Sequence, residues 1–81
     1  MSADEVQALL TAAFPDTQFQ VEGGGAKFTV QAIGDLFAGK RAVQRQQLIY
    51  GVLNEHIASG AIHAVSMSLH TPQEWAERGN G

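Results

Sequence analysis

The sequence predicts a single α+β domain whose helices and strands follow the order α-β-β-α-β, with a short helix at the C-terminal end. Hydrophobic residues recur every three or four positions in two long segments and every second position in three shorter ones. Glycine or proline stands at most of the junctions. A strand, a long helix and a further strand normally form a right-handed crossover. We therefore expect a three-stranded mixed sheet, with the third strand parallel to the second and helices covering one face.

The first helix is expected over residues 3–13. Ser2, followed three positions later by Glu5, has the form of a capping box, and apolar residues then recur at helical spacing. Pro15 supplies the stop because proline restricts the residue before it and cannot continue the hydrogen-bond ladder.

A β-hairpin is expected next, because residues 18–22 and 27–32 both alternate between apolar and polar side chains. The three glycines at 23–25 lie between these runs and predict a glycine-rich turn. They do not resemble a phosphate-binding loop, since no Lys-Ser/Thr pair and no helix N-terminus follow them.

The longest helix is expected over residues 40–59, after a loop or short turn at 34–39 that Leu36 and Phe37 pin to the core. Gly60 is the expected C-terminal cap. The apolar residues expected to share one broad face of this helix are Val43, Ile49, Tyr50, Leu53 and Ile57.

The C-terminal part predicts a third strand over residues 62–69 and a short helix after it. Thr71 is the expected N-cap of that helix, with a proline at the first helical position and a glutamate at the third. Trp75 is expected to anchor the helix on the sheet, and residues 77–81 are expected to fray.

The composition excludes several kinds of functional site. The chain has 81 residues and no cysteine, which excludes disulfides, thiol nucleophiles and an iron–sulfur cluster held by its own thiolates. A formal net charge of −3 disfavours a general attraction to nucleic acid or acidic membranes. No secretory signal and no transmembrane span are recognisable, so a cytoplasmic protein is expected. No acid–base pair or activated nucleophile stands out, and an enzyme is not expected.

Four segments carry a resemblance to the BolA-like family. Phe37–Tyr50 contains a Phe-x-Gly turn, then Val-x-Arg-Gln and a tyrosine one helical turn later. Ile62–Ser66 resembles the family's Ile-His-Ala-Leu-Ser strand, and Thr71–Trp75 resembles its Thr-Pro-x-Glu-Trp ending. Val21–Phe28 is similar to its glycine-rich loop. The likeness covers residues 4–76, nearly the whole chain.

The resemblance implies a fold like a class II KH domain and a partnership with a monothiol glutaredoxin. Such a pair shares a [2Fe–2S] cluster with glutathione, and the isolated BolA-like protein holds none. The family's histidine ligand corresponds to His63. Relatives carry a second ligand where this chain has Lys27, and a protonated amine is a poor ligand, so a second ligand from this chain is doubtful.

Three of the five basic residues, Lys40, Arg41 and Arg45, fall at the start of the long helix, where the helix dipole disfavours cations. Arg41 and Arg45 are four apart, a spacing suited to binding a carboxylate or a phosphate. A solvated charged face is the alternative. Partner contact is expected from these three cations and from the neighbouring residues Gln46, Gln47 and Tyr50.

The other histidines have ordinary structural interpretations. His56 lies near the C-terminus of the long helix, where the dipole favours a protonated imidazole. His70 precedes the turn at Thr71 and is expected to be an exposed loop residue. A three-histidine metal site is not expected.

The favoured hypothesis is a non-enzymatic adaptor in iron–sulfur trafficking or iron homeostasis. The first alternative is a DNA-binding transcription regulator acting in stress response, with the basic cluster on phosphates. The second is a protein-interaction module without a metal, which the lysine at position 27 favours. The free protein is expected to be a monomer or a weak homodimer.

Overall fold

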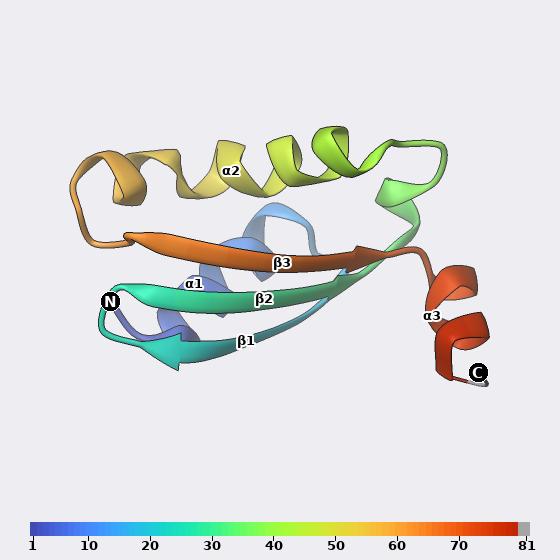
Figure 1. Cartoon of the computed structure of the whole chain (residues 1–81), viewed down its shortest axis with the longest axis horizontal. Coiled ribbons are helices and arrows are strands. Elements are labelled where there is room, and N and C mark those ends of the chain that lie inside the picture. The colour runs from blue at the N-terminus through green and yellow to red at the C-terminus, as the bar shows by residue number, and fades with distance from the viewer. Residues whose placement is uncertain (80–81) are drawn as a thin grey trace.

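The computed structural model describes residues 1–79 and contains a three-stranded sheet with three α-helices (Figure 1). The order of elements is the predicted one, with a 3-10 turn before the long helix. The elements are α1 (Ala3–Ala13), β1 (Gln18–Gly24), β2 (Lys27–Ile33), η1 (Asp35–Phe37), α2 (Ala42–Ala58), β3 (Ala64–His70) and α3 (Pro72–Gly79).

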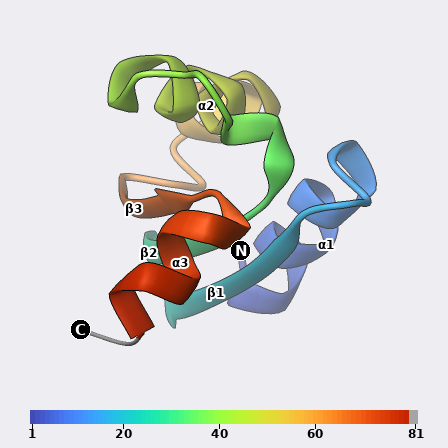
Figure 2. The same ribbon diagram turned by 90° about the vertical axis from the view of Figure 1, so that its right-hand side faces the viewer.

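The sheet has β2 at its centre, paired antiparallel with β1 and parallel with β3. This is the predicted mixed topology. Figure 2 looks along the sheet and shows α1 over the β1 side and α2 over the β3 side of the same face, while α3 lies at the end of the sheet. The opposite face is left open.

The core lies between the sheet and the two covering helices. Every second residue of β1 and β2 turns inward, which is the alternation that the sequence predicted. Phe37 of the 3-10 turn is fully buried, as expected for a residue that pins this loop. The buried apolar side chains are Val6, Leu10, Phe19, Val21, Phe28, Val30, Ala32, Phe37, Ile49, Leu53 and Ile62.

The capping motifs predicted for the two terminal helices are present. The Ser2 hydroxyl accepts from the backbone N–H of Glu5, whose carboxylate accepts from the N–H of Ser2. At α3, Thr71 and Glu74 make the same reciprocal pair. Each motif satisfies two backbone N–H groups that the first turn of a helix leaves free.

The long helix differs from the prediction in two respects. It begins at Ala42, so Lys40 and Arg41 precede its first turn instead of lying within it. Val43 and Tyr50 are 58% and 37% exposed, so they do not belong to the buried face. α1 and α2 share one face of a narrow three-stranded sheet, so only a narrow strip of α2 packs against it. The fully buried residues of α2 are Ile49 and Leu53.

The C-terminal segment also differs in detail. β3 begins at Ala64 and ends at His70, which leaves His63 just outside the strand. Residues 77–79 were expected to fray but form the end of α3, and residues 80–81 lie outside the described part of the chain. Within residues 1–79, no helix is long and apolar enough to cross a bilayer.

Candidate functional site

His63 stands where the chain enters the sheet. The residue before it, Ile62, is only 1% exposed, which fixes the backbone in the core. The backbone N–H groups of His63 and Ala64 both donate to the carbonyl oxygen of Ala26, at 2.7 and 3.1 Å. The hairpin turn and the start of β3 therefore hold the backbone of His63, while its side chain is exposed.

The imidazole of His63 lies beside the turn that follows α2. Its Nε2 is 3.9 Å from the point where a Cβ on Gly60 would stand. None of the hydrogen bonds formed within residues 1–79 engages this ring. An exposed imidazole without an internal partner can offer a nitrogen lone pair to an external metal.

Lys27 lies near His63 in the sheet. It pairs with Ala64 and is exposed, and the next residue of β2, Phe28, is buried against the helices. Alternation along the strand therefore directs Lys27 to the open face. The Nε2 of His63 instead lies near Gly60, in the turn that follows α2. The two side chains therefore have different surroundings.

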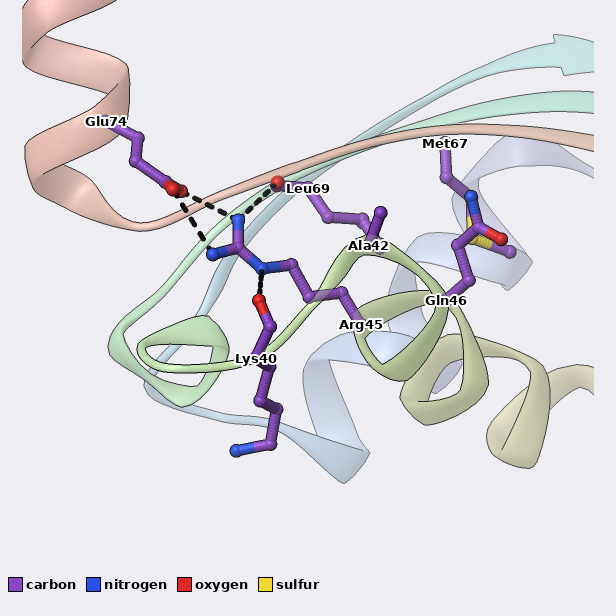
Figure 3. A pocket seen from close by; sticks show the side chains of 7 residues that line it. All are labelled: Lys40, Ala42, Arg45, Gln46, Met67, Leu69 and Glu74. Atoms are coloured by element: carbon purple, nitrogen blue, oxygen red, sulfur yellow. Dashed lines mark hydrogen bonds and ion pairs between the residues drawn. The ribbon is translucent and has the colours of Figure 1, made fainter.

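The basic cluster is built around Arg45, whose side chain is only 13% exposed. Its guanidinium donates to both carboxylate oxygens of Glu74, at 2.7 and 3.2 Å (Figure 3). It also donates to the carbonyl oxygens of Lys40, at 2.9 Å, and Leu69, at 3.1 Å. The ring of Phe37 lies 5.9 Å from its charged carbon. Arg45 thus ties α2 to β3 and α3.

The hydrogen bonds from Arg45, together with that from the backbone of Thr71, lower the pKa of Glu74 to about 2. The spacing of Arg41 and Arg45 predicted recognition of a carboxylate or a phosphate. The carboxylate that Arg45 binds in this structure belongs to the same chain. Lys40 and Arg41 remain exposed.

The predicted partner-binding residues are only partly gathered. Lys40, Arg45 and Gln46 line one cavity of about 340 Å³ between α2 and β3, together with Met67 and Glu74 (Figure 3). The remaining three, which are exposed but do not line it, are Arg41, Gln47 and Tyr50.

His63 and the basic cluster lie at opposite ends of β3. Leu69, whose carbonyl oxygen accepts from Arg45, is six positions after His63. At about 3.3 Å per residue in a strand, this separation is about 20 Å. The predicted ligand and the predicted docking residues therefore form two sites, which a single partner reaches only by extending along α2.

The remaining histidines occupy structural positions. His70 was expected in an exposed loop, but it is half-buried at the end of β3. Its Nε2 accepts from Arg78, at 3.0 Å, and lies 2.7 Å from the Ser68 hydroxyl, while its ring is 5.5 Å from that of Trp75. This cluster was not predicted, although the alternation of apolar and polar residues in β3 continues to residue 70 and was a signal for it.

His56 lies in the last turn of α2, as predicted, and is half-buried against α1. Among residues 1–79, no three histidine, aspartate or glutamate side chains come together in a way that could hold a metal ion. Trp75 is half-buried on α3 beside the end of β3, the position expected of an anchor.

Comparison with known proteins gives a consistent result. Residues 10–74 match the model of the family described as BolA-like protein. The chain is 45% identical over 76 residues to the acid stress protein IbaG of Escherichia coli K12, covering 94% of this chain and 90% of IbaG. Solved structures similar to this chain include two BolA-type proteins. A BolA homologue from Coxiella burnetii has a TM-score of 0.82 and 26% identity, covering 94% of this chain and 97% of its own. A related protein from Babesia bovis has a TM-score of 0.83 and 28% identity, covering 98% and 94%. The chain belongs to the BolA-like protein family.

Proposed function

We propose that this protein is a non-enzymatic adaptor that docks onto a monothiol glutaredoxin and contributes His63 to a shared [2Fe–2S] cluster. The observation that carries the proposal is the state of the His63 side chain. It is exposed and has no hydrogen-bond partner within residues 1–79, yet its backbone is held by Ala26 and by the buried Ile62. A ligand that is positioned but not engaged can bind metal without rearranging the fold.

The donor set of the chain fits a shared cluster better than a resident one. The sequence has no cysteine, and the described residues 1–79 contain no group of three potential metal ligands. One imidazole is too little to hold a cluster alone, so the thiolates would come from the glutaredoxin and from glutathione. When bound, a histidine in place of a thiolate changes the reduction potential of a cluster.

Lys27 supports a single ligand from this chain. Lysine is a poor ligand for a cluster iron, because a protonated amine has no lone pair to donate. Its strand position also directs it to the open face of the sheet, whereas the Nε2 of His63 lies near Gly60, after α2. We therefore assign the protein one cluster ligand.

The docking surface is proposed to include the exposed side chains near the start of α2. Lys40 and Arg41 are the free cations of the cluster, since Arg45 is engaged with Glu74. Gln46, Gln47 and Tyr50 continue this exposed surface along α2, in the direction of the His63 end of the sheet.

The test is to mix the protein with a cluster-loaded monothiol glutaredoxin and to record visible circular dichroism, which reports on the surroundings of the cluster. The wild-type protein should change the spectrum, and His63→Ala should abolish the change while far-UV circular dichroism stays the same. His56→Ala is the matched control and should behave as wild type. An unchanged spectrum with wild-type protein would refute the proposal and leave an interaction module without a metal.

DNA binding, the alternative regulator function, has weaker support. The chain carries a net charge of −3, and the internal Arg45–Glu74 pair leaves Lys40 and Arg41 as the exposed cations of the cluster. Non-specific DNA affinity depends on the number of phosphates that a protein neutralises. A gel-shift series at rising salt separates the two functions, because tight, sequence-dependent binding near physiological salt would favour the regulator.

A further inference from the structure

The outer edge of β3 offers unpaired backbone groups. The carbonyl of His70 accepts from Gly34 and the N–H of Ala64 donates to Ala26, so the even-numbered residues of β3 turn toward β2 and the odd-numbered ones turn outward. Three residues present outward groups, namely Val65, Met67 and Leu69. Arg45 donates to the carbonyl oxygen of Leu69. Within residues 1–79, no other side chain forms a hydrogen bond with this edge.

This edge lacks the features that protect sheet edges. The residues of β3 include no lysine, arginine, aspartate, glutamate or proline, which natural proteins use to prevent edge-to-edge pairing. The opposite edge of the sheet, formed by β1, has such protective features. On β1, the Gln7 side chain accepts from the outward N–H of Val21 at 3.1 Å, and the strand carries the charged residue Glu22.

An apolar line on α2 runs beside the same edge. Val43 and Tyr50 are the exposed large hydrophobic residues of the described chain, and they are seven residues apart on the helix. Residues at this spacing lie on one side of a helix. Gln46 is three residues after Val43 and four before Tyr50, so it lies on the same side of the helix. Gln46 also lines the cavity together with Met67, and this side of α2 therefore lies next to the β3 edge.

The surface is complementary to itself. A two-fold axis at Met67 would pair Val65 of one copy with Leu69 of another in an antiparallel ladder, in which the Leu69 oxygen would accept from Val65 as well as from Arg45. Because α2 connects two parallel strands, it runs antiparallel to β3, and the two α2 helices would also lie antiparallel. The exposed apolar lines would then face each other. The cationic start of one helix, at Lys40 and Arg41, would lie opposite the end of the other helix, which carries Glu55.

We infer that the β3 edge and the Val43–Tyr50 side of α2 form an interface between two copies of this chain, which joins their sheets into one. The inference rests on the strand edge and the helix surface and not on the cluster. It uses Gln46 and Tyr50, which the proposed docking surface also includes, so a second copy and a glutaredoxin would compete for this side of α2. The interface would satisfy the free backbone groups of β3 and cover the two exposed hydrophobic residues at the same time.

Sedimentation equilibrium of the full chain tests the inference. The mass of the wild-type protein should rise with concentration from that of one chain toward that of two. Val43→Glu places a charge in the apolar line and should weaken dimerisation at least about tenfold, a change of about 1.4 kcal/mol. Gln44→Glu, one residue along on an exposed position, is the matched control and should dimerise as wild type. A single-chain mass at every concentration overturns the inference and leaves this edge to an extended segment of another protein.

The absence of cysteine allows a direct test of the register. In the inferred ladder, Ser66 of one copy lies opposite Ser68 of the other as a non-hydrogen-bonded pair, with a Cα separation of about 4.5 Å that suits a disulfide. Mixing Ser66→Cys with Ser68→Cys under oxidising conditions should give a cross-linked dimer. Gln20→Cys, exposed on β1, is the control and should not cross-link with either. A wild-type dimer without the mixed cross-link would place the interface elsewhere and overturn the assignment.

Discussion

Two adjacent glycines in the hairpin should respond in opposite ways to alanine. Gly23 has a φ of +121°, and a Cβ added to it would collide with the carbonyl oxygen of Lys27 and lie 3.0 Å from the Cα of Phe28. Gly24 does not have a positive φ, and its Cβ would meet no atom within 4 Å. Gly23→Ala should therefore strain the hairpin, whereas Gly24→Ala should only restrict the unfolded chain.

The magnitudes follow from the size of the chain. A strained backbone conformation costs about 1–3 kcal/mol. The unfolding entropy of 81 residues is about 0.17 kcal/mol per degree, so Gly23→Ala should lower Tm by about 6–18 °C. Gly24→Ala should raise stability by about 0.4–1 kcal/mol, which corresponds to an increase of about 2–6 °C. Thermal denaturation followed by far-UV circular dichroism measures both. Equal shifts in the two variants would refute the hairpin geometry.

The same pair of variants tests the link between hairpin and ligand. The carbonyl of Ala26 accepts from the backbone of His63, so distortion of the turn should displace the imidazole. At a temperature where both variants are folded, Gly23→Ala should give a weaker cluster response with glutaredoxin than Gly24→Ala. Equal responses would show that the turn does not position His63.

Three further substitutions test the contacts that position β3 and α3. Because the pKa of Glu74 is lowered from 4.5 to about 2, its ionised form stabilises the fold above pH 4.5, and this contribution is lost as the pH falls toward 2. The Tm difference between wild type and Glu74→Gln should therefore be present at neutral pH and shrink between pH 4.5 and 2, and a constant difference would contradict the pairing with Arg45. Thr71→Ala removes the N-cap of α3 and should cost about 1 kcal/mol, measured by chemical denaturation against a Thr71→Ser control. Ile62→Val should cost about 0.5–1.5 kcal/mol because the side chain is 1% exposed, and a neutral result would show that the entry to β3 is less tightly packed.

Local signals predicted the parts of the fold that depend on local chemistry. The bounds of α1 coincide with the prediction because the capping box at Ser2 and the stop at Pro15 determine both ends. The start of α2 was placed two residues early. Arg41 occupies the N-cap position without being a preferred capping residue, and the Gln44 side chain accepts from its N–H instead.

The sequence did not show which side chains from different helices and strands contact each other. Arg45 and Glu74 are 29 residues apart, and periodicity shows which face a residue occupies but not which side chain from another element lies opposite it. The same limit applies to His70, whose partner Arg78 comes from the following helix. Residue types and spacing indicated arginines that bind a carboxylate or a phosphate, and packing determined that Arg45 binds the carboxylate of Glu74 in the same chain.

The position of the two sites on β3 determines how their roles can be separated. His63 and the cluster around Arg45 stand about 20 Å apart along the strand, beyond the distance at which neighbouring side chains couple strongly. In the proposed complex, His63 would determine how the iron is ligated, whereas Lys40 and Arg41 would contribute to affinity. Substitution of His63 should therefore remove the spectral change and preserve binding. Substitution of Lys40 and Arg41 should weaken binding and leave the ligand intact. A partner whose affinity depended on His63 alone would not be using the cationic end of α2, and the docking surface would then lie around the hairpin.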